Sequence, residues 1–364
     1  MLYIPVLGAS GQRLMPCHAA RARQLIRGGR AIKRHDRGVV YLVLLERESG
    51  DTQPVALGID PGNKKEAFVV QSTQHTLLSL QADAVTWVGR AVQRRRVARR
   101  LRRGRKCPRR ACRPNRRAQR GRVPPSTRAR WGLKVRIAQW LARYYPLTTI
   151  VIEDIKAPTK PGKKRWNRSF SPLEVGKRWC YGELGKIAVV RPVAGYVTKA
   201  LREEAGLPKA GAKRSERWDA HCVDAFVLAN AAASGPARPT SVQMLVLVPL
   251  QLHRRQLHRF NRGKGNRPQP YGGTTSMGLK RGSWVRHPRY GLCYVGGTMG
   301  LWISLHSMET GKRLTQAARP GDCQVYCISS WRVRAAQGAA PAASRQRRPI
   351  PLPPVGGSLL GDVL

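Results

Sequence analysis

Three carboxylate positions stand out in a chain that has few acidic residues. Asp60 ends the apolar run VALGID, Glu153 ends the run TTIVIE, and Asp224 follows His221 by three residues. That last spacing places both side chains on one face of a helix. Carboxylates that converge from separate elements can hold two Mg²⁺ ions about 4 Å apart, which activate water and stabilise the leaving oxygen of a phosphodiester. The near-neutral pKa of an imidazole suits a general base.

Each of these signals also has a purely structural explanation. Asp60 precedes a Pro-Gly pair, and Asp is favoured in turns. A helical His-x-x-Asp pair is often a hydrogen-bonded surface pair. Two further acids lie close by, but strand alternation points Asp154 away from Glu153, and Asp219 stands where Asp favours a helix terminus. We therefore predict structural roles for Asp154 and Asp219.

The charge balance predicts a polyanionic partner. The chain has 364 residues with 68 Lys and Arg against 19 Asp and Glu, a formal net charge of +49. Such an excess indicates nucleic acid as the partner. A membrane is not expected, because the sequence has no apolar run of about 18 residues and does not begin like a signal peptide. We expect a soluble intracellular protein whose eight cysteines, which include no C-x-x-C pair, stay reduced.

Basic charge is spread along the chain, but one stretch stands apart: residues 84–152 contain 22 Lys and Arg and not a single Asp or Glu. Its arginines favour a helix up to the point where Gly104 and Pro108 should end it. A disordered basic segment is the alternative, but the flanking strand-like runs favour a helix that orders on RNA or DNA. Arg guanidinium groups suit phosphates. The candidate nucleic-acid contacts here are Arg94, Arg95, Arg99, Arg102 and Arg103.

The remaining pattern predicts an α/β fold in which helices flank a mixed sheet. Strands are expected at 39–45, 55–60, 66–71, 76–80, 148–153 and 187–190. Helices are expected from Ser126 as N-cap, at 173–184 and at 218–232. After an Ala/Gly/Pro-rich boundary at 231–239, short β runs between Gly turns predict a small, mostly β C-terminal module, and the last residues predict a disordered tail.

Several segments resemble one known group of proteins. LGIDPG at 57–62, IVIED at 150–154 and HCVDA at 221–225 resemble the three split motifs of RuvC-like nucleases, which have an RNase H-like fold. The Arg-rich segment resembles the bridge helix of RNA-guided nucleases. RLMP at 13–16, with ARQLIRGGRA behind it, is similar to the N-terminal PLMP domain of the transposon-encoded IscB and IsrB proteins, although Arg13 replaces the first Pro.

Two further observations make this resemblance more specific: segments in the C-terminal part, and the absence of His from residues 154–220. YGGT at 271–274 and KRG at 280–282 are similar to the same group. IscB proteins carry an HNH nuclease between the second and third RuvC motifs, but residues 154–220 contain no His. The chain therefore resembles the HNH-less IsrB family, and a single nuclease centre implies that one strand is cut.

The resemblance implies an RNA-guided DNA nickase that cuts the non-target strand and uses a transposon-encoded omega RNA as guide. Asp60, Glu153 and Asp224 would be ligands of two Mg²⁺ ions, with Mn²⁺ as a substitute. His221 would assist proton transfer, and whether it is a general base or a metal ligand stays open. The implied partners are guide RNA and target double-stranded DNA, bound by a monomer acting on the nucleoid in a prokaryotic cytoplasm. Further nucleic-acid contacts are expected at Arg27, Arg30, Lys280 and Arg281.

The implied domain order runs along the whole chain. It comprises a PLMP domain (1–54), RuvC part I (55–83), the bridge helix with its basic segment (84–125), RuvC part II (126–160), a linker with RuvC part III (161–235), a C-terminal module contacting RNA and a target-adjacent motif (236–340), and a disordered tail (341–364). Two alternatives remain. A guide-free RuvC-like or transposase-like nuclease would share the carboxylates, and a nuclease-inactive RNA-binding protein would share the charge.

Overall fold

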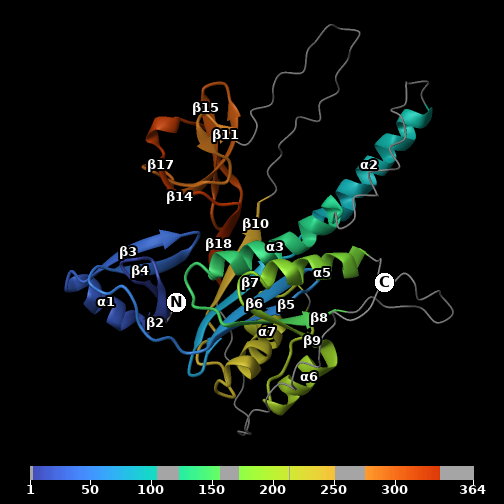
Figure 1. Cartoon of the computed structure of the whole chain (residues 1–364). Coiled ribbons are helices and arrows are strands. Elements are labelled where there is room, and N and C mark those ends of the chain that lie inside the picture. The colour runs from blue at the N-terminus through green and yellow to red at the C-terminus, as the bar shows by residue number, and fades with distance from the viewer. Residues whose placement is uncertain (1–2, 105–122, 156–171, 213, 251–274, 337–364) are drawn as a thin grey trace, which may run out of the picture.

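The computed structural model describes residues 3–104, 123–155, 172–212, 214–250 and 275–336. The YGGT segment and the expected tail lie outside these residues. Figure 1 shows a central sheet with helices on both sides, a smaller N-terminal sheet beside it, and a C-terminal β unit above it. The predicted mixed α/β fold with a β-rich C-terminal part is confirmed. Within the described residues, none of the helices combines the length and apolar character that crossing a membrane requires.

The N-terminal unit is a four-stranded sheet in the order β2-β1-β4-β3, with one helix packed on it. Its elements are β1 (Tyr3–Leu7), β2 (Arg13–His18), α1 (Ala19–Arg27), β3 (Ala31–Asp36) and β4 (Val39–Leu44). The His18 ring caps the helix, because its Nδ1 accepts a hydrogen bond from the Ala20 amide at 3.3 Å. Ala22, Ala31 and Leu42 form its small core.

The central sheet has seven strands in the order β18-β10-β7-β6-β5-β8-β9. Its strands are β5 (Val55–Asp60), β6 (Lys65–Ser72), β7 (Thr76–Asp83), β8 (Thr149–Asp154), β9 (Val189–Ala194), β10 (Met244–Pro249) and β18 (Trp331–Ala336). The first three form the predicted antiparallel meander. β8 runs parallel to β5, and β9 runs parallel to β8. The carboxyl ends of β5 and β8 therefore meet at one edge.

Helices cover both faces of this sheet. They are α3 (Pro125–Leu141), α5 (Pro172–Leu184), α6 (Gly195–Glu204) and α7 (Trp218–Ala233). Leu57, Ile59 and Phe68 share a core with α3 and α5, whereas Ala67 and Val69 pack with α7. Figure 1 shows α3 and α5 on one side of the sheet and α7 on the other. Because the parallel strands β5 and β8 are covered on both faces, they contain the apolar runs VALGI and IVI.

Several predicted boundaries were wrong by a few residues, and two of them have a clear physical reason. The helix expected to be capped by Ser126 begins at Pro125, with Pro124 as N-cap and no side-chain cap. Proline suits the first helical position because its missing N–H has no helical partner there. The strand expected at 187–190 begins at Val189, since the Ile187 amide donates to the Leu184 carbonyl in the turn that ends α5.

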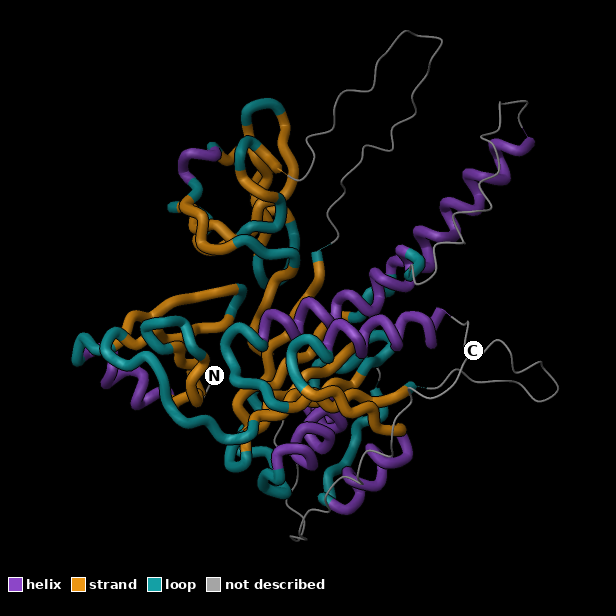
Figure 2. The backbone as a smooth tube through the Cα atoms, viewed as in Figure 1, coloured by secondary structure: helices purple, strands orange, loops and turns teal. Residues whose placement is uncertain are grey.

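The predicted Arg-rich helix is present as α2 (Trp87–Gly104). Val88 at its start is buried against the core, whereas Arg94, Arg95 and Arg99 are exposed. Figure 2 shows the helix projecting away from the central sheet. The side chains of Arg102 and Arg103 lie outside the described part of the chain.

The C-terminal unit differs from its predicted extent. Its sheet has five strands in the order β16-β15-β14-β13-β17, and a two-stranded ribbon pairs β11 with β12. These are β11 (Thr275–Ser276), β12 (Leu279–Lys280), β13 (Trp284–His287), β14 (Gly291–Met299), β15 (Trp302–Ser307), β16 (Arg313–Ala318) and β17 (Gln324–Cys327). The expected module at 236–340 was too wide, because β10 and β18 belong to the central sheet. The β10 side chains Val246 and Leu247 are fully buried there.

Candidate active site

Asp60 lies at the carboxyl end of β5, on the face of the sheet that α7 covers. The alternation along β5 sends Leu57 and Ile59 toward α3, so Gly58 and Asp60 face α7. A Cβ atom on Gly58 would stand 1.9 Å from the Ala225 carbonyl oxygen. The glycine therefore permits the helix backbone to lie directly on the strand, which brings the α7 side chains to the end of β5.

Glu153 lies beside Asp60 at the end of the neighbouring parallel strand. Ile59 is in register with Ile152, so the two carboxylate residues follow paired positions. The carboxylate of Glu153 acts on Asp60, since its charge raises the pKa of the Asp60 carboxyl beyond the effect of burial. Its Oε1 also lies over the first turn of α6, where a Cβ on Gly195 would come within 2.8 Å of it. The amino end of a helix favours a negative charge.

Asp224 completes the group from α7. It is 2 % exposed, and Leu228, one turn later on the helix, packs against Val151 of β8. Burial raises the pKa of Asp60 well above its usual range, and the nearby carboxylates of Glu153 and Asp224 raise it further. The register of β5 with β8 and the contact of Gly58 with Ala225 of α7 place the three residues on one face of the sheet. The structure therefore brings Asp60, Glu153 and Asp224 together.

His221 and the neighbouring acids take different positions. His221 is buried on α7, one turn before Asp224. Asp154 points to the other face of the sheet, where its Oδ1 accepts hydrogen bonds from Lys177 Nζ at 2.7 Å and Tyr181 Oη at 2.9 Å. Asp219 pairs with Arg217, whose Nη2 lies 2.6 Å from its Oδ2. Both contacts agree with the structural roles expected for Asp154 and Asp219.

Two basic residues that the sequence did not single out hold Asp224. Arg202 of α6 donates from Nη1 to Oδ1 at 2.7 Å, and Lys209 donates from Nζ to Oδ2. Both oxygens of Asp224 are thus engaged by cations. In a chain so rich in Lys and Arg, no sequence signal separates these two from the rest. The loop between α6 and α7 brings Lys209 to the carboxylates.

The three carboxylates are chemically suitable ligands for a divalent metal. They offer the oxygen ligands that Mg²⁺ prefers, and their mutual repulsion, seen in the raised pKa of Asp60, would be relieved by a cation. Among the described residues, no set of three or more His, Cys, Asp or Glu side chains has an arrangement ready to hold a metal ion. Arg202 and Lys209 already engage Asp224, so a metal bound there would stand beside two cations.

Gly58→Ala tests the close packing of β5 on α7. The added methyl group would collide with the Ala225 backbone, so the helix must shift. Overpacking of this kind lowers the free energy of unfolding by about 1–3 kcal/mol. Urea unfolding followed by circular dichroism measures it. Gly89→Ala is the matched control, because no atom lies within 4 Å of its new Cβ; equal stability of the two variants would contradict the predicted clash.

The expected nucleic-acid contacts differ in exposure. Arg27 and Lys280 are exposed, and Arg30 is exposed while its Nε lies 3.2 Å from Glu46 Oε2. Arg281 differs from the other three. This side chain is 7 % exposed, and its Nε donates to Ser276 Oγ at 3.0 Å, so the guanidinium stabilises the β11–β12 turn from inside.

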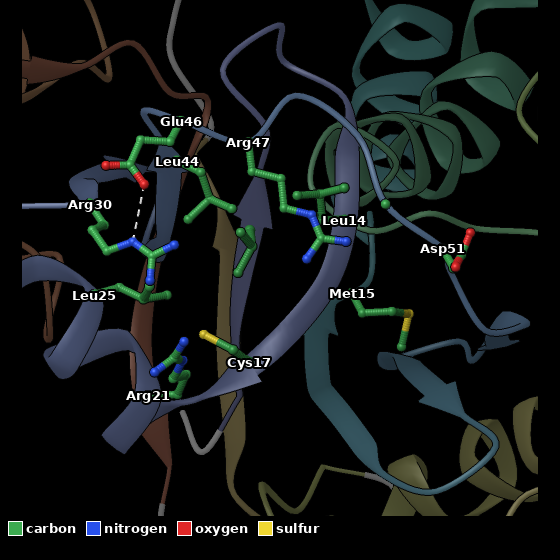
Figure 3. A pocket seen from close by; sticks show the side chains of 12 residues that line it. Leu14, Met15, Cys17, Arg21, Leu25, Arg30, Leu44, Glu46, Arg47 and Asp51 are labelled. Atoms are coloured by element: carbon green, nitrogen blue, oxygen red, sulfur yellow. Dashed lines mark hydrogen bonds and ion pairs between the residues drawn. The ribbon is translucent and has the colours of Figure 1, made fainter.

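A separate pocket of about 240 Å³ lies in the N-terminal unit. Figure 3 shows the side chains of Leu14, Leu25 and Leu44 around it, together with Arg21 and Arg47. None of Asp60, Glu153 and Asp224 lines this pocket, so the pocket is distinct from the carboxylate group.

Comparisons with known proteins give one family and two distant structures. Residues 4–165 match a family described as RRXRR protein, a stretch somewhat under half of the chain, and residues 99–103 read RRLRR. None of the curated proteins compared with the chain matches it.

Two solved structures are similar over part of the chain. One is T. thermophilus RuvC in complex with a Holliday junction substrate, with 14% identity and a TM-score of 0.27, covering 48% of this chain and 90% of that one. The other is a CRISPR-Cas12f ternary complex, with 15% identity and a TM-score of 0.30, covering 57% of this chain. The match spans 47% of the Cas12f chain, about half of its length.

Proposed function

We propose that this protein is an RNA-guided DNA endonuclease of the IsrB type, which nicks the non-target strand with one RuvC-like centre. The observation that carries the proposal is the meeting of Asp60, Glu153 and Asp224 at the edge where β5, β8 and α7 come together. The RRXRR family, which is found in IscB-like and IsrB-like proteins, supports it. The absence of His from residues 154–220 supports an architecture without HNH.

In this proposal the three carboxylates hold two Mg²⁺ ions. The ions, when bound, supply an activated water and a stabilised leaving oxygen. Glu153 and Asp60 come from neighbouring strand ends and Asp224 from a packed helix, so the ligands are held by rigid elements. His221, one turn before Asp224, accepts the proton of the attacking water.

The basic surfaces have separate proposed roles. The exposed arginines of α2 grip the backbones of guide RNA and the RNA–DNA duplex, as in a bridge helix. The N-terminal unit (1–54) contributes to RNA binding with Arg27 and Arg30, and the C-terminal unit contacts RNA and the target-adjacent motif through Lys280 and its neighbours. The protein acts as a monomer with its RNA on double-stranded DNA in a prokaryotic cytoplasm.

In this proposal, the three RuvC parts of the chain contribute strands to one sheet. Residues 55–83, 126–160 and 161–235 supply its central strands, and β10 and β18 extend it on the far side of β7. The central sheet with its three carboxylates is the proposed RNase H-like unit.

Nicking of a plasmid tests the proposed function. The full chain, purified with its copurifying RNA, is expected to convert a supercoiled plasmid that matches the guide into open circles when Mg²⁺ is added. A plasmid with a scrambled target, and protein treated with ribonuclease, are the controls and are expected to stay supercoiled. Linear product in bulk would contradict a single-strand cutter, and equal nicking of both plasmids would point to a guide-free nuclease.

A further inference from the structure

The ammonium group of Lys209 contacts Asp224, one of the three carboxylates. Its Nζ donates to Asp224 Oδ2, and its charge also acts on Asp60, where it opposes the rise in that carboxyl's pKa. The positive charge of one Lys side chain therefore acts on two of the three proposed metal ligands. A buried carboxylate cluster needs such a counter-charge, because like charges close together oppose ionisation.

The two cations on Asp224 differ in how firmly they are held. Arg202 projects from α6 and its side chain is 15 % exposed, whereas the Lys209 side chain is 37 % exposed and lies on the loop between α6 and α7. Leu207, two residues earlier, is buried in the core and fixes the loop beside the site. An ammonium on a flexible four-carbon stem can leave its partner more readily than a planar guanidinium.

A divalent metal bound to the second oxygen of Asp224 would stand beside the Lys209 ammonium and repel it, because both are cations. Metal binding must then include loss of the Lys209 contact, which lowers the apparent affinity for the metal. Arg202, bonded to the other oxygen, can keep Asp224 in place during this exchange.

We propose that Lys209 is a built-in counter-ion that competes with the divalent metal for Asp224 and leaves the carboxylate when the metal binds. This proposal rests on the proposed function, because it takes Asp60 and Asp224 as metal ligands. It makes Lys209 a positioning residue that stabilises the carboxylate group between metal-binding events.

Binding of Mn²⁺ to the full chain without nucleic acid tests the proposal. The electron paramagnetic resonance signal of free Mn²⁺ is followed during titration of wild type and variants. Lys209→Gln is expected to bind Mn²⁺ about tenfold more tightly, which corresponds to about 1.4 kcal/mol. Lys199→Gln is the matched control, since that Lys is exposed on α6 and lies 3.6 Å from Glu203; its affinity is expected to equal that of wild type.

A charge-conserving variant separates charge from loop distortion. Lys209→Arg keeps the cation, and because a guanidinium leaves a carboxylate less readily than an ammonium, this variant is expected to bind Mn²⁺ no more tightly than wild type. Unchanged or weaker binding by Lys209→Gln would overturn the proposal, and so would tighter binding by Lys209→Arg.

Asp60→Asn distinguishes failure of this inference from failure of the proposed function. If Asp60→Asn loses Mn²⁺ binding while Lys209→Gln binds like wild type, only the counter-ion role is wrong. If Asp60→Asn binds Mn²⁺ as wild type does, the carboxylates are not the metal site, and both proposals are overturned.

Discussion

Asp60→Asn is expected to slow Mg²⁺-dependent nicking by at least about 10³-fold, equivalent to about 4 kcal/mol of transition-state stabilisation. Asp60 is 6 % exposed and follows a position of β5 that pairs with Ile152, next to Glu153, so its loss removes a ligand from the proposed site. The measurement is the single-turnover rate of plasmid nicking by the protein with its RNA.

The Asp60→Asn variant should fold, and bind nucleic acid, as wild type does. Asparagine has nearly the same shape as aspartate, and it removes a buried group that its neighbours Glu153 and Asp224 repel when it is charged. Asp219→Asn is the matched control, because that carboxylate pairs with Arg217 at the start of α7 and is expected to leave the rate unchanged. A rate for Asp60→Asn within threefold of wild type would contradict the proposed role.

Lys134→Met is expected to lower the free energy of unfolding by about 3–5 kcal/mol. Lys134 of α3 donates from Nζ to Glu66 Oε1 at 2.7 Å, and both side chains are almost fully buried. Methionine fills a similar volume but leaves the Glu66 carboxylate without its counter-charge. Urea unfolding at neutral pH measures the loss, and the double variant Glu66→Gln with Lys134→Met should recover most of it.

The loss should depend on pH in a defined direction. Burial raises the pKa of Glu66, and the charge and hydrogen bond of Lys134 oppose this rise. Without Lys134 the folded-state pKa rises further above the unfolded value, so the variant is least destabilised below the unfolded pKa. The loss of unfolding free energy in the variant grows as the pH increases through the pKa of Glu66 in the folded state. A deficit below about 1 kcal/mol at neutral pH, or one that shrinks with rising pH, would contradict this account.

Local sequence patterns predicted the elements around the site well. Apolar runs and turn residues placed the β5–β7 meander, and helical spacing placed α5 and α7, because these signals lie within a few residues of each other. Strand alternation also distinguished Glu153 from Asp154, whose side chain bonds to Lys177 on the opposite face.

Contacts between residues far apart in the sequence explain which features could not be predicted from the sequence. Met244 of β10 pairs with Ser79, and Trp331 of β18 pairs with Pro249, so strands assigned to a separate module extend the central sheet. The burial of Arg281 and the contact of Lys209 with Asp224 also depend on the folded chain. In a sequence with 68 basic residues, nothing local marks which of them lie inside.

The most direct test is the anomalous diffraction signal of Mn²⁺ in crystals of the full chain with its RNA. We predict Mn²⁺ peaks bonded to oxygens of Asp60, Glu153 and Asp224, at about the 2.0–2.2 Å expected for a small hard divalent ion, with Lys209 Nζ withdrawn from Asp224. Saturating Mn²⁺ with no peak at these carboxylates, or with the metal bound only elsewhere, would contradict the proposed nuclease centre.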